Sequence, residues 1–233
     1  MASCGRPRRS WPWPGIGWRK ESLLGLTERL FDRSPQEWAF LGLALLIAIP
    51  IHEFAHAIAA RWAGDHTAED MGRVTLDPLK HLDPVGTFLI LLGGFGWGKP
   101  VPVNPANFRS PRWGSVLVSA AGPASNILLA LALGVIGFRL GLLQHVGFTY
   151  QSLAVQLIGL NLGLAFFNLI PVPPLDGSHV LVGLLPGEQA IRVAKVLEQG
   201  GLLLLILIVF TGLTGVLIGP PVRLLLGLFT GLW

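Results

Sequence analysis

Long apolar runs, separated by short polar segments, make up most of the sequence after its first 36 residues. Four of these runs have the length of a membrane-spanning helix, which rises about 1.5 Å per residue through a hydrocarbon core about 30 Å thick. They cover residues 38–62, 113–140, 152–170 and 201–218. Shorter apolar stretches at 85–97 and 222–233 are too short to cross upright. The pattern predicts an all-α polytopic membrane protein with about four to six membrane segments.

The segment between the first two predicted spans has a different character. Residues 93–108 are rich in glycine and then alternate valine with proline, which no helix tolerates. Proline favours an extended conformation at a sheet edge, and irregular backbone survives at membrane depth only when protein buries it or it lines a cavity. We expect a short re-entrant or β-hairpin element here, able to take up an extended substrate segment by strand addition. A plain loop between spans is the alternative.

The chain divides into three parts by composition. Residues 1–36 are basic and Trp-rich, which predicts an interfacial segment, with a disordered tail as the alternative. Residues 37–218 form the predicted membrane domain, in which the polar stretch 186–200 lies at the interface. Residues 219–233 form a short apolar C-terminal segment, because two prolines end the last predicted span.

Composition excludes several classes of protein. The chain of 233 residues is 52% hydrophobic and 13% charged, whereas soluble domains carry about 25% charged residues. Its basic residues lie at the N-terminus and in short loops, where they orient spans and meet lipid headgroups, so a nucleic-acid partner is not expected. The single cysteine, Cys4, excludes an internal disulfide. Any bound metal must therefore be held by ligands other than a cysteine pair, such as His, Asp or Glu.

Three polar residues interrupt the first apolar run: His52, Glu53 and His56. Positions i and i+4 of a helix share a face about 5–6 Å apart at Cβ, so the two histidines can reach one metal ion, with Glu53 beside it as a free base. This is the H-E-x-x-H arrangement of zinc hydrolases. Polar groups at membrane depth cost free energy, about 2.5–3.5 kcal/mol each for charged types, and a bound metal is the simplest compensation. The alternative is a pair of buried structural histidines.

The third ligand is not decided by spacing. Asp176 follows the third span, where it is either a metal ligand or the cap of a short helix over residues 178–185. His179 is the competing candidate. His66 and His81 lie in the polar connection after the first span, where histidines are more often solvated than metal-bound.

Three motifs in order, HEFAH at 52–56, AGPASN at 121–126 and NLIPVPPLDG at 168–177, resemble the site-2 protease family of intramembrane zinc metalloproteases, peptidase family M50. The stretches TLDPLKHLDPVGT at 75–87 and GWGKPVPVNP at 96–105 are similar to the small bacterial branch without PDZ or CBS domains. The resemblance covers about residues 38–215.

The resemblance implies one zinc ion per chain and a defined set of site residues. The implied zinc ligands are His52, His56 and Asp176, the implied general base is Glu53, and Asn126 and Asn168 are implied near the scissile peptide as oxyanion or substrate-binding residues. Its implied substrates are membrane-spanning segments of client proteins in the bilayer. A zinc carrier or a client-holding scaffold is the rival function, but a carrier needs a polar path through the bilayer. Here the polar groups gather on one side.

Basic residues indicate the orientation. The loops at 61–112 and 186–200 share one face of the membrane and carry Arg61, Arg73, Lys80, Lys99, Arg109, Arg112, Arg192 and Lys195. The positive-inside tendency then predicts a multi-pass protein of the cell membrane with its active site near the cytoplasmic side. The basic N-terminus opposes this orientation unless it folds back to the interface.

Overall fold

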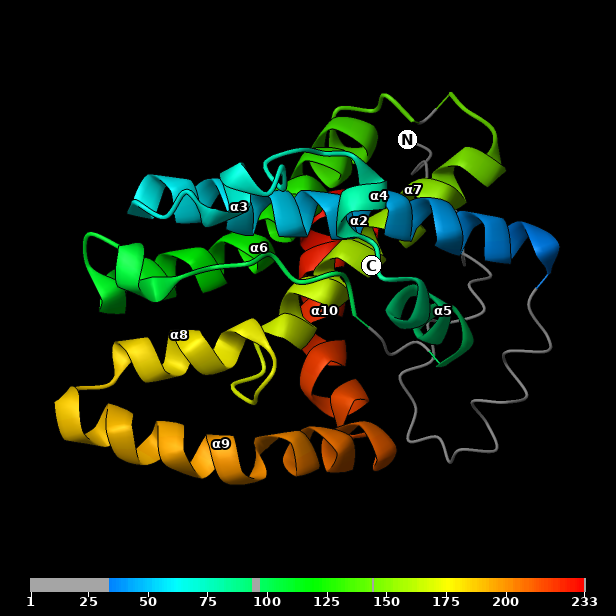
Figure 1. Ribbon diagram of the computed structural model, residues 1–233. Helices are drawn as coiled ribbons and strands as arrows, with labels where there is room; N and C mark the ends of the chain where they lie inside the picture. Colours follow the sequence, from blue (N-terminus) through cyan, green and yellow to red (C-terminus); the bar gives the residue numbers. More distant parts are fainter. Residues whose placement is uncertain (1–33, 94–96, 144, 233) are drawn as a thin grey trace, which may run out of the picture.

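The computed structural model describes residues 34–93, 97–143 and 145–232, and within them the chain is helical without any β-strand (Figure 1). In chain order the elements are α2 (Pro35–Ala63), α3 (Thr67–Asp70), α4 (Pro78–His81), α5 (Pro84–Gly93), the 3-10 turn η1 (Pro105–Asn107), α6 (Pro111–Gly134), the π-helical turn η2 (Val135–Arg139), α7 (Phe148–Asn168), α8 (Asp176–Leu184), α9 (Gly187–Phe210) and α10 (Leu213–Thr230). The all-α prediction is confirmed. The predicted interfacial segment, residues 1–36, lies outside the described residues except for its last three.

Five of the described helices are long and apolar enough to cross a membrane. The qualifying stretches are Trp38–Ala63, Pro111–Arg139, Phe148–Asn168, Gly187–Phe210 and Leu213–Thr230. This number lies within the predicted four to six, and the first three helices match the predicted spans closely. The chain is a multi-pass membrane protein.

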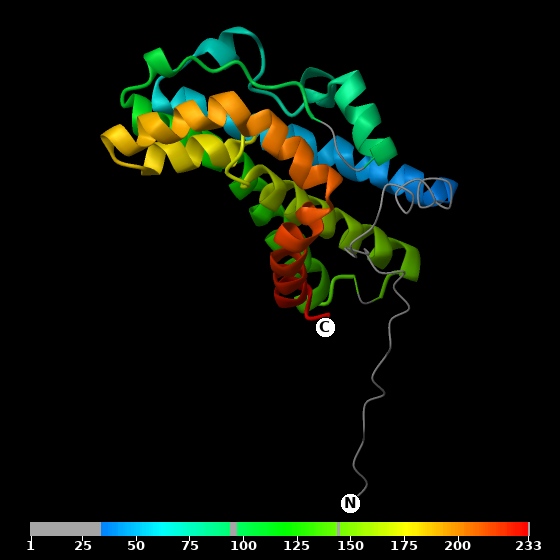
Figure 2. The same cartoon turned by 90° about the horizontal axis from the view of Figure 1, so that it is seen from below.

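Helix α6 lies at the centre of the bundle, packed against α2, α7 and α8 (Figures 1 and 2). It runs antiparallel to α2, because Val118 meets His56 while Asn126 meets Ala48. The start of α6 is tied to the end of α8 by Arg112, whose Nε donates to the Gly183 carbonyl at 2.6 Å. The apolar core lies between α6, α7, α9 and α10 and includes Ala130, Ile158, Leu162, Leu205, Ile218 and Val222.

The last predicted span, residues 201–218, is wrong in both its limits. The polar stretch 186–200, expected at the interface, forms the first half of α9. The helical conformation is interrupted at Gly212, whose φ of +70° is left-handed. Left-handed backbone suits glycine, which has no Cβ to clash. Helix α10 then runs through Pro220 and Pro221 and across the predicted boundary at 219. Membrane helices tolerate such prolines because neighbouring groups satisfy the freed carbonyls.

The end of α10 lies beside the end of α6. Arg139 in η2 donates from Nη2 to the Leu228 carbonyl at 2.7 Å. Helix α9 begins at the opposite end, just after α8. The α9–α10 pair therefore leads from one end of the bundle to the other (Figure 2).

The β-hairpin expected over residues 93–108 is not formed among the described residues. Residues 84–93 form helix α5, and residues 97–104 run without helix or strand until η1. Pro100 and Pro102 lack the N–H groups that a strand ladder requires. Side chains of the connection between α2 and α5 bind residues 97–104 instead. Residues 97–104 are called the strap below.

Candidate metal centre

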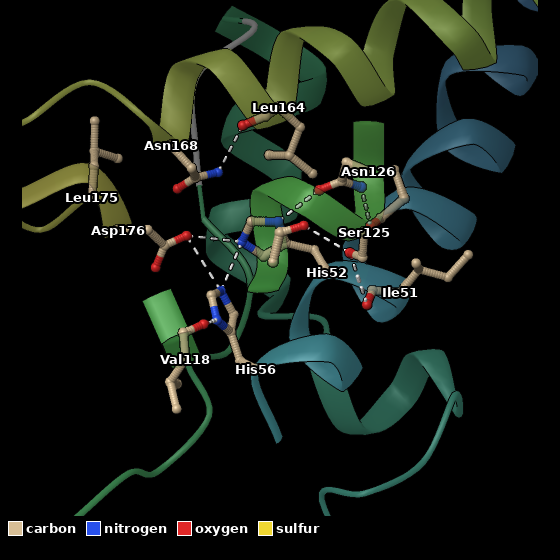
Figure 3. Close-up of polar contacts among 12 residues, drawn as sticks. Ile51, His52, His56, Val118, Ser125, Asn126, Leu164, Asn168, Leu175 and Asp176 are labelled. Carbon is tan, nitrogen blue, oxygen red and sulfur yellow. Dashed lines mark hydrogen bonds and ion pairs between the residues drawn. The ribbon is translucent and has the colours of Figure 1, made fainter. Parts of the chain in front are cut away.

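The side chains of His52, His56 and Asp176 converge on one point inside the bundle (Figure 3). The Nε2 atoms of the two histidines lie 3.0 Å apart, and Asp176 Oδ2 lies 3.2 Å from the first and 3.3 Å from the second. Both histidines come from the face of α2 that packs on α6, and they are 5% and 8% exposed. Asp176 comes from the first turn of α8, which returns the chain to this point after α7 ends.

Hydrogen bonds on the far side of each ring fix which nitrogen faces the centre. His56 Nδ1 lies 2.7 Å from the Val118 carbonyl, which can only accept, so Nδ1 carries the proton. His52 Nδ1 lies 2.6 Å from Asn126 Oδ1. The amide nitrogen of Asn126 donates to the Ala48 carbonyl at 3.1 Å, so its oxygen faces His52. Both Nε2 atoms therefore present lone pairs to the centre.

The donor set fits a cation. With both rings neutral, two imidazole lone pairs and a carboxylate oxygen face one another, and Asp176 Oδ2 is buried without a hydrogen-bond partner. Such an arrangement of acceptors is unfavourable unless a positive charge holds it together. Ligands at about 2.0–2.1 Å from a tetrahedral zinc ion lie about 3.3 Å from each other, close to the observed spacing. These three residues fit zinc and leave a fourth position for water or substrate.

Asp176 lies where a metal ligand should lie and does not cap a helix. It is the first residue of α8, the N-cap position belongs to Leu175, and no side chain caps this helix. His179, the competing candidate, is exposed on α8 and outside the convergent group. His66 binds Glu69 on the surface, and buried His81 binds the Thr75 carbonyl through Nε2. None of these three histidines reaches the centre.

Two glycines make room for the ligands. A Cβ at Gly122 on α6 would overlap His56 Nε2 and come within 2.7 Å of the His52 ring. A Cβ at Gly177 would overlap the Leu169 carbonyl oxygen at the end of α7. Gly122 therefore lets α6 pass directly over both rings, and Gly177 lets α8 start close enough to α7 for Asp176 to reach them.

Glu53 lies beside the centre, next to the strap. It is half-buried on α2, and the backbone of Gly98 passes so close that a Cβ there would lie 3.2 Å from Glu53 Oε1 and 2.9 Å from Ile49 Cγ2. The same position would lie 3.2 Å from the His81 carbonyl, which accepts from the Lys99 N–H at 2.7 Å. The strap thus crosses directly over the general base predicted from the sequence.

Two buried charged residues outside the candidate membrane-spanning helices hold the strap. Arg73 donates from Nη2 to the Lys99 carbonyl at 2.6 Å and from Nη1 to the Pro100 carbonyl at 3.2 Å. Burial lowers the pKa of this guanidinium below its ordinary value, and the negative charge of Glu53 opposes the shift. Asp65 accepts from the Asn104 N–H at 2.7 Å at the strap's other end.

The Asp65 carboxylate accepts three further hydrogen bonds. They come from the Thr67 N–H and hydroxyl and from the Asn107 side-chain amide. Burial by itself raises the pKa of Asp65, but these bonds and the Asn104 bond outweigh it and lower the pKa to about 2. Sequence reasoning missed Asp65 and Arg73, because a single charged residue in a polar loop carries no sign of burial.

The two asparagines implied near the substrate differ in position. Asn126 is fully buried, and its second amide proton is donated to Asn161 Oδ1 at 2.8 Å, so in this structure it orients His52. Asn168 is half-buried at the end of α7 and donates to the Leu164 carbonyl at 3.0 Å, with Asp176 nearby (Figure 3). Contact of either residue with a substrate stays a prediction.

Comparisons with known proteins identify the family of this chain. Residues 40–158 and 141–208 match Peptidase family M50. Three relatives named as candidate zinc metalloproteases are YwhC of Bacillus subtilis (43% identical over 73% of this chain and 80% of YwhC), Rip2 of Mycolicibacterium smegmatis (31% over 70% and 64%) and sll0528 of Synechocystis (36% over 80% and 44%). The chain spans less than two thirds of the last two. No solved structure matches it. The chain belongs to peptidase family M50, the site-2 protease family that its three motifs resemble.

Proposed function

We propose that this protein hydrolyses peptide bonds within or next to the membrane-spanning helices of client proteins. Its family and its convergent ligand group make it a zinc metalloprotease with zinc as cofactor. The proposal concerns where the substrate lies. The observation that carries it is the depth of the site along a membrane helix.

The ligands of α2 lie far from either end of its apolar stretch, Trp38–Ala63. At about 1.5 Å per residue, His52 lies about 16 Å from the end at Ala63 and about 21 Å from Trp38. Because the hydrocarbon core of a membrane is about 30 Å thick, His52 lies within it when the apolar stretch of α2 spans the membrane. A peptide bond that reaches this centre lies at membrane depth, as a segment of a membrane-spanning substrate does.

The residues have distinct roles in the proposed reaction. Zinc, when bound, supplies a Lewis acid that polarises the scissile carbonyl and activates water. Glu53 accepts the proton of the attacking water on its carboxylate and returns it to the leaving nitrogen. His52, His56 and Asp176 hold the metal, and the deep burial of both rings keeps the site dry, which strengthens the electrostatic interactions in it.

The strap gives the substrate a place to unwind. A helix hides its peptide bonds, so the client segment must become extended before it is cut. Within the described residues, no hydrogen bond is formed by the backbone N–H or carbonyl of Val101 or Val103. An extended client segment can pair with these groups by strand addition beside Glu53. We therefore expect helix-weakening residues near the cut in the client segment.

The proposed location is the cell membrane, with the active site toward the cytoplasm. Arg73, Lys80 and Lys99 lie in the connection between α2 and α6, and the positive-inside tendency of such basic loops supports this orientation. The test uses a Cys4→Ser background with Lys80→Cys in α4 or Leu142→Cys after η2, both at exposed positions in the connections before and after α6. A membrane-impermeant maleimide added outside intact cells should label only Leu142→Cys. Labelling of Lys80→Cys alone would reverse the orientation.

The function is tested by zinc content together with cleavage of single-span substrates in detergent. The proteins compared are the wild type, Glu53→Gln and, as matched control, Glu188→Gln, whose side chain is exposed at the start of α9. We expect equal zinc in all three, with cleavage lost only in Glu53→Gln. The cut, mapped by mass spectrometry, should fall within or beside the membrane segment.

The other outcomes each have a meaning. Normal turnover by Glu53→Gln would refute its role as base. Cuts confined to soluble tails would refute the intramembrane substrate. Zinc in every protein with cleavage in none, over a broad substrate panel, would favour the carrier or scaffold function.

A further inference from the structure

Asn161 is a fully buried primary amide in α7 that belongs to none of the three motifs. Its neighbours along the same helix, Ile158, Leu162 and Ala165, are buried apolar residues. A polar amide in such surroundings destabilises the fold unless all its groups are hydrogen-bonded. Its presence in the core therefore calls for a specific contact.

The contacts of Asn161 determine its orientation. Its Nδ2 lies 2.8 Å from the Leu157 carbonyl of the preceding turn, and a carbonyl only accepts. The nitrogen must therefore face Leu157, and the oxygen Oδ1 must face Asn126 Nδ2, 2.8 Å away. The amide of Asn126 is then held between two acceptors, Asn161 Oδ1 and the Ala48 carbonyl.

This arrangement continues to the metal centre. With both of its amide protons donated, Asn126 has only its oxygen to offer His52, at 2.6 Å from Nδ1. His52 Nδ1 must then carry the proton, and Nε2 is left with its lone pair toward His56 and Asp176. His52, Asn126, Asn161 and the Leu157 carbonyl thus form one hydrogen-bonded row across α2, α6 and α7, with the Ala48 carbonyl as a further acceptor at Asn126.

We propose that Asn161 is a positioning residue for zinc: through Asn126 it holds His52 with Nε2 toward the metal. It touches neither the metal nor the substrate. The proposal rests on the zinc site and is independent of which peptide is cut, because its readout is metal binding. Partners that hydrogen-bond a metal ligand, as Asn126 does, contribute about 10–100-fold to metal affinity in other zinc sites, and Asn161 acts through that partner.

The test compares two replacements of similar size. Asn161→Leu removes both hydrogen bonds and leaves one Asn126 N–H unpaired in the core. Asn161→Asp, in the neutral form that a buried apolar site favours, donates its O–H to Leu157 and accepts from Asn126, so it restores the row. The matched control is Thr230→Val, which at a buried residue of α10 also removes two hydrogen bonds, one to the Leu226 carbonyl and one from the Leu232 N–H.

Zinc affinity is measured by chelator competition, and the ligand field by the visible spectrum of the cobalt-substituted protein. We expect Asn161→Leu to bind zinc at least about tenfold more weakly with an altered cobalt spectrum. Asn161→Asp should stay within about threefold of wild type, and Thr230→Val should match it. Should Asn161→Leu not fold, Asn161→Ala carries the same expectation with less bulk. Wild-type affinity and spectrum in the folded Leu or Ala variant would overturn the proposal, as would equal losses in the Asp variant.

Discussion

Gly122 on α6 lies directly against the imidazole of His56 on α2, so closely that a single methyl group there would overlap Nε2. The same methyl group would come within 2.6 Å of His56 Cε1 and 2.7 Å of His52 Cε1. Helices α2 and α6 therefore pack so closely at His52 and His56 that no side-chain atom fits between Gly122 and the two rings. This close approach brings the Val118 carbonyl into contact with His56 Nδ1.

Gly122→Ala should abolish or severely weaken zinc binding, because the new methyl group displaces both rings from the point where they meet Asp176. The matched control is Gly163→Ala in α7, where a Cβ meets nothing within 4 Å. Alanine is the better helix former, by about 1 kcal/mol, so the control should be no less stable than wild type. Zinc content after purification measures both. Full zinc occupancy in Gly122→Ala would contradict the described packing.

Gly177→Ala should also reduce zinc affinity, by a different route. Its methyl group would overlap the Leu169 carbonyl oxygen and push the start of α8 away from α7, taking the Asp176 carboxylate with it. Gly187→Ala, at the start of α9 with nothing within 4 Å, is the control and should bind zinc normally. Chelator competition distinguishes a weakened site from a lost one. Equal affinities in the two variants would show that α8 tolerates the displacement.

The third ligand is tested by a pair of alanine variants. Asp176→Ala should lose zinc, because it removes the only oxygen in the convergent group, whereas His179→Ala should retain it, because His179 is exposed outside that group. Both residues lie in the first turn of α8, so a general disturbance of this helix would affect them alike. Loss of zinc in His179→Ala with retention in Asp176→Ala would reverse the assignment.

Asp65 should make stability depend on pH. Its folded-state pKa of about 2 lies below its ordinary value of 3.8, so its contribution is fully present above about pH 4 and is lost as the pH falls through 2. The shift corresponds to roughly 2 kcal/mol. Asp65→Asn should therefore lower Tm at pH 6, and its deficit should shrink as the pH falls below about 4. Asp70→Asn, at an exposed site, is the control. A deficit that is constant with pH would refute the assignment to the carboxylate.

The sequence predicted the parts of the site that depend on local spacing. His52 and His56 lie four residues apart on one helix, so any helix through them presents both rings on one face. Asp176 needed the motif at 168–177 as well, because spacing alone left it open as a helix cap. The hydrogen bonds of Asn161 and Arg73 described above join segments more than 25 residues apart in the sequence. Local sequence patterns do not predict such long-range partners.

Helix boundaries were predicted best where polar residues mark the end of an apolar run. Helix α2 begins at Pro35, three residues before the predicted start of the first apolar run at residue 38. The break between α9 and α10 depends on one glycine within a continuous apolar run, and periodicity does not reveal it. The hairpin prediction failed because prolines suit any extended backbone, paired or not. Within the described residues the strap has no partner strand, and the side chains of Arg73 and Asp65 bind its backbone instead.

The split of the ligand set between α2 and α8 has a consequence for biosynthesis. The two histidines leave the ribosome about 120 residues before Asp176. The ligand set is therefore still incomplete when α2, α6 and α7 enter the membrane. The three-residue set is complete only after α8 has been translated and has docked on α6. The chain therefore lacks its catalytic centre while these three helices are being inserted.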